Sequence, residues 1–277
     1  MSILSGKAGA VDGAAIVRNW NISTTADTQA YVASNTQGGT GRQIGNTDWS
    51  GAYDAYGHTP ANMPGETFEF KGSVQGTTGA VSPASGAIVE SVVITCDIEG
   101  GGILSHVVNF AGNGVLTKGA AVATDPTALI PTSSIGCDAQ LGTLAASPVY
   151  TAITDVRGWT LTISAANQSY VSSDTAGGTK RTMGNIDATL SISVYESDLT
   201  ALPVENDINA IRLFVDASTH WEILWGMFGE ISDVLVDIET ATVIGATLNA
   251  SMNGLADIAS TDTIGSIKTP ADVTFWP

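Results

Sequence analysis

Basic side chains are scarce in this chain. Lys and Arg together number 10, against 27 Asp and Glu, which gives a formal net charge of −17 at pH 7 over 277 residues. Proteins that hold nucleic acid gain much of their affinity from basic side chains on phosphates. A chain of this charge repels DNA and RNA, so we exclude a protein that binds nucleic acid through electrostatic attraction.

Cysteine and histidine are rare as well. Cys96 and Cys137 are the only cysteines and no Cys-x-x-Cys pair occurs, so neither a disulfide-rich scaffold nor a structural zinc site is indicated. A single bridge between the two is left open. The three histidines, His58, His106 and His220, have no nucleophile or acid beside them in a recognisable arrangement. We therefore expect no enzyme, no cofactor and no metal centre.

Long hydrophobic runs are also missing. No 18 consecutive residues are apolar, and the most hydrophobic region, Ile223–Leu248, is interrupted by four acidic residues. The first 20 residues lack the continuous apolar block of a secretory signal, so we expect a soluble chain without an export signal. Hydrophobic residues still make up 43% and charged residues 13%, which suits a globular protein with packed cores and not a disordered one.

The most informative feature of the sequence is an internal duplication. Residues 17–48 align without a gap to 156–187 at an offset of 139, and about half of these 32 positions are identical. A second stretch, 97–114, aligns to 237–254 at an offset of 140 and shares Asp-Ile-Glu and a closing Asn-Gly. The chain therefore contains two copies of one unit.

These copies define the domain organisation that we expect. Copy 1 covers residues 1–125, copy 2 covers 140–277, and 126–139 form a linker. The linker lies in the segment 118–147, which is rich in Ala, Thr, Ser and Pro. Each predicted domain is close to the usual size of roughly 100–150 residues.

Both copies show the two-residue period of β-strands with one buried face. The apolar positions of these alternations are Trp49, Gly51, Tyr53 and Ala55; Ile94, Cys96 and Ile98; Leu104, His106, Val108 and Phe110; Leu190, Ile192 and Val194; Val234, Val236 and Ile238; and Ile244, Ala246, Leu248 and Ala250. Further expected strands are Arg18–Thr24, Tyr31–Ser34, Phe68–Val74, Ile88–Ser91 and Ile211–Ala217. We predict an all-β protein of two tandem antiparallel β-sandwich or barrel domains. For the apolar segment Asp207–Phe228 helix and strand both stay open, so one flanking helix per domain is left open too.

Other conspicuous residues have structural explanations. His106 falls on an inferred buried face, which favours a core histidine, whereas His58 and His220 are expected in loops. The Gly-rich segments 37–42 and 176–181 lack the Gly-Lys-Ser/Thr of a phosphate loop and are expected to be turns. The acidic pairs, Asp97 with Glu99 and Asp237 with Glu239, are expected on the solvent face, with calcium binding as a minor alternative.

Several polar residues recur in both copies and need an explanation. One explanation is turn and ion-pair chemistry inside each domain. The other is that both copies occupy equivalent places in a ring and present the same charged groups to their neighbours. On the second explanation we expect inter-subunit contacts from six residues: Arg18, Arg157, Arg42, Arg181, Asp48 and Asp187. Charge reversal of these arginines should then weaken ring formation more than folding.

The repeated pattern resembles a known family. Val-Arg-x-Trp-x-(Ile/Leu), then Tyr-Val-x-Ser-x-Thr-x-Gly-Gly-Thr, then Gly-Asn-x-Asp run over 17–56 and again over 156–195, and they resemble the tail tube proteins of tailed bacteriophages. The resemblance implies β-sandwich domains, commonly with one flanking helix, that form stacked hexameric rings around a DNA channel. A chain with two tube domains implies trimeric rings with pseudo-sixfold symmetry.

This resemblance defines the leading functional hypothesis. The chain is expected to be a structural virion protein of the tail, assembled in the host cytoplasm, with itself and other tail proteins as partners. An acidic channel would let DNA pass without binding it. The alternatives are a head decoration or cement protein, and a carbohydrate-binding β-sandwich that uses aromatic residues such as Trp49 and Tyr53.

Overall fold

The regular structure of the protein is almost entirely β. The computed structural model describes residues 10–11, 16–74, 78–121, 131–143, 149–175, 177–195, 203–217, 219–232, 245–252 and 258–261. Within these ranges the only helices are three 3-10 turns, η1 (Ser34–Thr36), η2 (Ser134–Gly136) and η3 (Ser173–Thr175). The all-β prediction is therefore confirmed. The flanking helix left open by the sequence is absent from the described ranges, because Asp207–Phe228 folds as two paired strands.

The strands follow the duplication along the chain. In copy 1 they are β1 (Ala10–Val11), β2 (Val17–Tyr31), β3 (Gly41–Tyr56), β4 (Thr67–Phe68), β5 (Lys71–Val74), β6 (Thr78–Val81), β7 (Ala87–Asp97), β8 (Ser105–Gly112) and β9 (Thr117–Ala121). The later strands are β10 (Asp138–Gly142), β11 (Tyr150–Ala152), β12 (Val156–Ala165), β13 (Gln168–Tyr170), β14 (Lys180–Thr182), β15 (Ile186–Tyr195), β16 (Ile208–Phe214), β17 (His220–Ser232), β18 (Gly245–Met252) and β19 (Ile258–Thr261).

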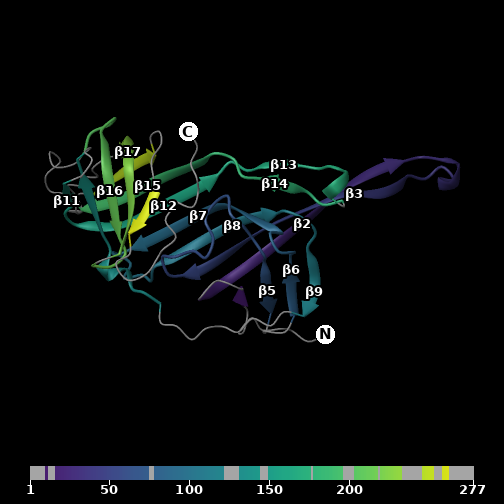
Figure 1. Cartoon of the computed structure of the whole chain (residues 1–277), viewed down its shortest axis with the longest axis horizontal. Coiled ribbons are helices and arrows are strands. Elements are labelled where there is room, and N and C mark those ends of the chain that lie inside the picture. The colour runs from purple at the N-terminus through teal and green to yellow at the C-terminus, as the bar shows by residue number, and fades with distance from the viewer. Residues whose placement is uncertain are drawn as a thin grey trace, which may run out of the picture.

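One large antiparallel sheet runs through both copies (Figure 1). Copy 1 contributes β2-β3-β8-β7, and copy 2 continues it with β12-β15-β18-β17, the same order of equivalent strands. Register shifts also recur at an offset of 139: Val17/Asn19 in β2 matches Val156/Gly158 in β12. Val89/Ser91 in β7 likewise matches Phe228/Glu230 in β17. The duplication in the sequence is therefore a duplication of strand order and of local irregularities.

A small second sheet lies against the large one in copy 1. Its order is β1-β5-β6-β9, and Figure 1 shows β5, β6 and β9 below the large sheet. Phe70, just before β5, packs on Phe110 of β8 with ring centroids 4.9 Å apart, and Trp49 and Trp20 also contact Phe70. This aromatic layer buries the inner faces of both sheets, the arrangement of a β-sandwich.

Copy 2 closes its core with further strands of the large sheet. The sheet continues from β17 through β16, β10 and β11. The indole N–H of Trp159 on β12 donates to the carbonyl of Phe214 at the end of β16, 3.3 Å away, so these two parts of the sheet face one another. Trp159 of β12 and Trp221 of β17 are almost fully buried in this core.

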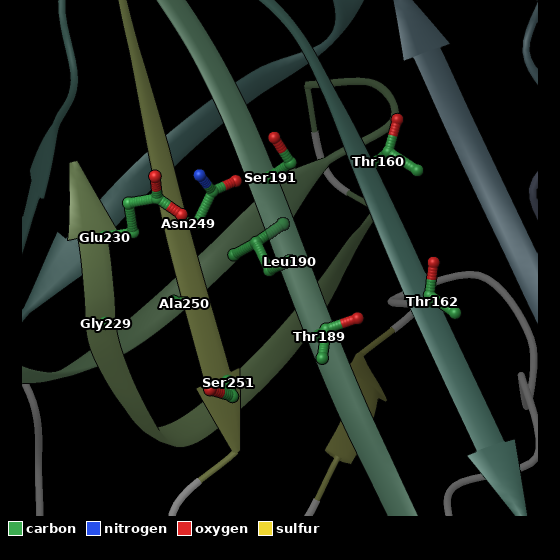
Figure 2. A pocket seen from close by; sticks show the side chains of 10 residues that line it. All are labelled: Thr160, Thr162, Thr189, Leu190, Ser191, Gly229, Glu230, Asn249, Ala250 and Ser251. Atoms are coloured by element: carbon green, nitrogen blue, oxygen red, sulfur yellow. The ribbon is translucent and has the colours of Figure 1, made fainter. Parts of the chain in front are cut away.

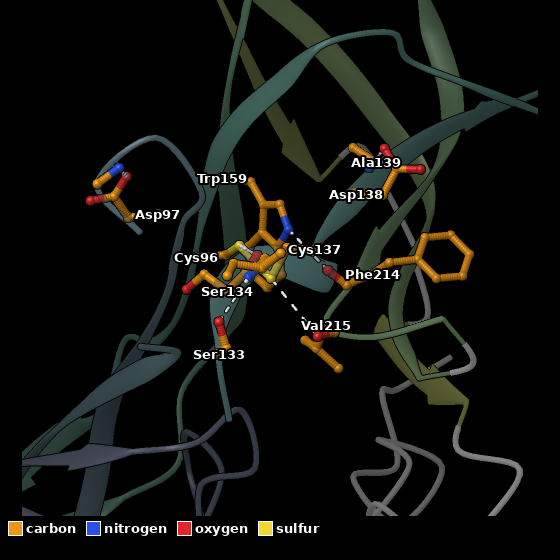
Figure 3. Close-up of a disulfide and its surroundings, with 12 residues drawn as sticks. Cys96, Asp97, Ser133, Ser134, Cys137, Asp138, Ala139, Trp159, Phe214 and Val215 are labelled. Atoms are coloured by element: carbon orange, nitrogen blue, oxygen red, sulfur yellow. Dashed lines mark hydrogen bonds between the residues drawn. A yellow bond between two sulfur atoms is a disulfide. The ribbon is translucent and has the colours of Figure 1, made fainter. Parts of the chain in front are cut away.

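A disulfide joins the two cysteines (Figure 3). Cys96 lies near the end of β7 and Cys137 follows η2, and both are buried. The segment 118–147, predicted as a linker, contains β10, η2 and most of β9 within its described residues. The bond therefore ties the chain between the copies to the sheet of copy 1.

Several strand limits differ from the prediction. The strand predicted for Tyr31–Ser34 ends at Tyr31, and a 3-10 turn follows; Phe68–Val74 is split between β4 and β5. His220 was expected in a loop, but it begins β17 and its ring packs on Phe214. The alternation at Val234, Val236 and Ile238 lies outside the described residues.

Candidate assembly interface

The junction between the copies is a strand-to-strand contact. Residues 91–97 of β7 pair antiparallel with 158–164 of β12, with Cys96 opposite Trp159. Because β12 begins the four-strand unit of copy 2 in the sheet order and β7 ends that of copy 1, the two units meet edge to edge. Main-chain hydrogen bonds in this ladder make the sheet continuous.

The hairpin formed by β13 and β14 crosses this junction and docks on copy 1. Thr47 accepts from the N–H of Thr179 at 3.1 Å and donates its own N–H to Gly177 at 2.8 Å. The guanidinium of Arg181 makes two hydrogen bonds to the carboxylate of Asp48, at 2.9 and 2.7 Å. It also donates to the carbonyl of Gly112. The Arg181 side chain is only 12% exposed, so this bidentate pair is largely shielded from water.

Backbone approach completes the docking. A Cβ on Gly178 would lie 3.3 Å from the carbonyl carbon of Gly114 on the copy 1 turn, which leaves little room for a side chain. Asn113 in the same turn accepts from the N–H of Arg181 at 2.8 Å. The Gly-Gly-Thr motif of copy 2 and the Asn-Gly motif of copy 1 therefore contact each other.

A second ion pair spans the junction at the other end of the strands. Arg157 of β12 donates to Glu99 of copy 1, and its guanidinium lies 4.5 Å from the ring centre of Tyr195. The Tyr195 hydroxyl donates to the same carboxylate. Hydrogen bonds from Tyr195 and then from Arg157 hold the pKa of Glu99 below its usual value of 4.5.

The residues equivalent to Arg157, Arg181 and Asp48 in the other copy lack these partners among the described residues. Arg18 lies over Tyr56, as Arg157 lies over Tyr195, but it pairs with Asp54 of its own copy and is 45% exposed. Arg42 is exposed and makes no ion pair with the described residues, and Asp187 is exposed. Of the six residues predicted for inter-subunit contacts, the structure thus brings Arg181 to Asp48 and places Arg157 on Glu99, and it leaves Arg42 and Asp187 apart.

Two sheet edges are open within the described structure. β2 pairs only with β3, so the other side of this 15-residue strand has no ladder partner among the described residues. On β17, pairing with β16 ends at Met227, with two further hydrogen bonds between Phe228 and the 206–207 backbone. Beyond Phe228 this side of β17 has no described partner, whereas the matching part of β7 pairs with β12.

On the face of the large sheet turned away from the core, Arg157, Asp97 and Glu99 line a hollow over the junction of the copies, and the neighbouring part is polar with little charge. Figure 2 shows a shallow hollow on it over β12, β15, β17 and β18. Its lining consists of Thr160, Thr162, Thr189, Leu190, Ser191, Gly229, Glu230, Asn249, Ala250 and Ser251. Glu230 is the one charged residue in this set, so the hollow has no basic side chain that could bind a phosphate.

The residues considered for catalysis have structural places. His106 is buried, with Nδ1 2.9 Å from the carbonyl oxygen of Gly57, and burial lowers its pKa. Trp49 and Tyr53, named for sugar stacking, are buried in the copy 1 core. No group of three His, Cys, Asp or Glu within the described ranges could hold a metal ion. Among the same residues, no helix has the length and apolarity needed to span a bilayer.

Comparison with protein-family models and with curated proteins finds no match to this chain. The assignment of the site therefore depends on its geometry. Sequence reasoning missed the role of Glu99, which it placed on the solvent face, and the close approach of Gly178 to Gly114. The available signal was that Asp-Ile-Glu, Gly-Gly-Thr and Asn-Gly all recur in both copies.

Proposed function

We propose that this chain is a structural virion protein, a tail tube subunit of a tailed bacteriophage. Three chains would form a ring of six equivalent four-strand units, and rings would stack into a tube. One observation carries the proposal: copy 1 and copy 2 join edge to edge in a single sheet, with their strands in the same order. In such a ring, the junction between copy 1 and copy 2 would be one of the lateral contacts.

The open sheet edges support ring closure. A long unpaired edge such as that of β2 is a template for pairing with another chain, and a closed barrel removes such edges. If β17 of one chain pairs with β2 of the next as β7 pairs with β12, each added chain repeats the internal junction. A heterologous contact of this kind closes into a ring when its rotation allows.

The part of this sheet face that lacks basic side chains suits the wall of a channel for DNA. Its hydroxyl and amide groups in the hollow of Figure 2 offer no basic side chain to phosphates, and Glu230 repels them. The net charge of −17 acts in the same direction at longer range. DNA would therefore pass along this wall without being held.

Electron microscopy and analytical ultracentrifugation of the purified full chain test the proposal. We expect rings with three chains each that stack into tubes at high protein concentration. A chain that stays monomeric at every concentration and is absent from virion tails would refute it. Labelling on the capsid instead of the tail would favour the head decoration protein.

A further inference from the structure

The docking of the β13–β14 hairpin on copy 1 joins two surfaces, one from each copy: the hairpin itself and the site that receives it. The hairpin supplies Gly178, Thr179 and Arg181, and copy 1 receives it with Thr47 and Asp48. The duplication supplies both faces again. The hairpin residues recur as Gly39, Thr40 and Arg42. On the receiving side Asp48 recurs as Asp187, and Ile186 takes the position of Thr47.

Among the described residues, the second set of faces makes no such contact within one chain. Gly178 is buried, whereas its counterpart Gly39 is exposed; Arg181 is 12% exposed, whereas Arg42 belongs to the exposed class. In Figure 1 the copy 1 hairpin of β2 and β3 extends far beyond the body of the molecule. Within the described ranges, the carboxylate of Asp187 accepts only the N–H of Ala188.

Arg42 and Asp187 cannot meet inside one chain. Arg42 lies on β3 and Asp187 on β15, and β8, β7 and β12 lie between these strands in the sheet. The hairpin that carries Arg42 also projects away from copy 2 in Figure 1. A contact between the two residues therefore requires two molecules.

We propose that the copy 1 hairpin of one molecule docks on copy 2 of a second copy of this chain, with Arg42 paired to Asp187 of the partner subunit. This inference rests on the proposed function and names the surface that joins neighbouring chains. Pairing of β2 with the open side of the partner's β17 would carry the hairpin across the seam, as pairing of β12 with β7 carries β13 and β14.

Charge explains why another copy of this chain fits the surface. Chains of net charge −17 repel one another, so their contact depends on the few cations available. Four of the five arginines are the repeated residues Arg18, Arg42, Arg157 and Arg181, and two of these already join copy 1 to copy 2. The carboxylate equivalent to Asp48, the partner of Arg181, is Asp187.

A charge swap tests the pairing. Arg42→Glu and Asp187→Arg are each expected to weaken assembly of the full chain by about tenfold or more in analytical ultracentrifugation. Combining both substitutions in one chain restores the ion pair at every seam, so assembly should recover. The matched control is Arg181→Glu, the same change at the equivalent residue, which should lower the melting temperature of the unassembled chain while Arg42→Glu leaves it unchanged.

The outcomes separate this inference from the proposed function. Rings that form normally with Arg42→Glu, or that stay weakened in the double variant, would overturn the Arg42–Asp187 contact and leave the tube assignment standing. If Arg42→Glu forms normal rings that fail to stack, the contact between neighbouring chains of one ring is also overturned. The hairpin would then join successive rings. A wild-type chain that forms no rings would overturn both.

Discussion

The disulfide between Cys96 and Cys137 should be a large contributor to stability. It links positions separated by 41 residues. A loop of this length restricts the unfolded chain by about 4 kcal/mol in the chain-entropy model. Cys96→Val combined with Cys137→Ala removes the bond and preserves much of the packing, since Val236 occupies the position equivalent to Cys96 in copy 2. We expect this double variant to fold with a stability lower by that amount.

Urea unfolding followed by tryptophan fluorescence measures the effect. With a denaturant dependence of about 3 kcal/mol/M, the midpoint should fall by about 1.3 M. Reduction of the wild-type chain should move its midpoint to nearly the same place, whereas the double variant should not respond to reductant. A midpoint difference below about 0.3 M would refute the loop-entropy argument, because it would mean that other contacts already restrict this segment in the unfolded state.

Three further predictions follow from single residues. The pKa of Glu99 is lowered from 4.5, so the ionised carboxylate stabilises the fold above pH 4.5, and this contribution is lost as the pH falls through the lowered pKa. The difference in urea midpoint between the wild type and Glu99→Gln should therefore shrink on acidification. A constant difference would contradict this. Burial and the neighbouring Glu222 raise the pKa of Tyr150 to about 12, so Glu222→Gln should lower it in an ultraviolet titration referenced to Tyr150→Phe, and an unchanged value would show that Glu222 does not contribute. Phe110→Ala, at a fully buried position among aromatic rings, should destabilise the protein by about 3–5 kcal/mol in thermal unfolding, and a loss below about 1 kcal/mol would contradict the packing described.

The sequence predicted the parts of the fold that depend on repeated periodicity. Leu190, Ile192 and Val194 are buried on β15, and Trp49, Tyr53 and Ala55 are buried on β3, as the two-residue alternation indicates. The small sheet could not be assigned in the same way, because its strands are short and rich in Gly, Ala, Ser and Thr. β5 and β6 pair with each other as chain neighbours, but β1 and β9 join them from distant parts of the chain, and only the folded structure identifies those pairings.

The candidate site was predicted by residue but not by partner. Arg181 and Asp48 were expected to contact other subunits, and the structure places them against each other across the junction of the two copies. A duplication makes internal and external neighbours equivalent, so the sequence alone does not distinguish them. Asp207–Phe228 posed another ambiguity, because short apolar runs suit either a buried helix or a strand; the pairing of β16 with β17 resolves it.

The matched register shifts have a mechanical consequence. A β-bulge places an extra residue in one strand, which bends that strand and increases its twist. Each copy carries such shifts at the same two places, near Val17 and Val156 and near Val89 and Phe228. Both halves of the molecule therefore bend at the same two places, and β2 carries one further shift between Ala26 and Thr28. The circumference of any closed object made from them is set by backbone geometry inside each subunit, and changing one shift would alter its radius.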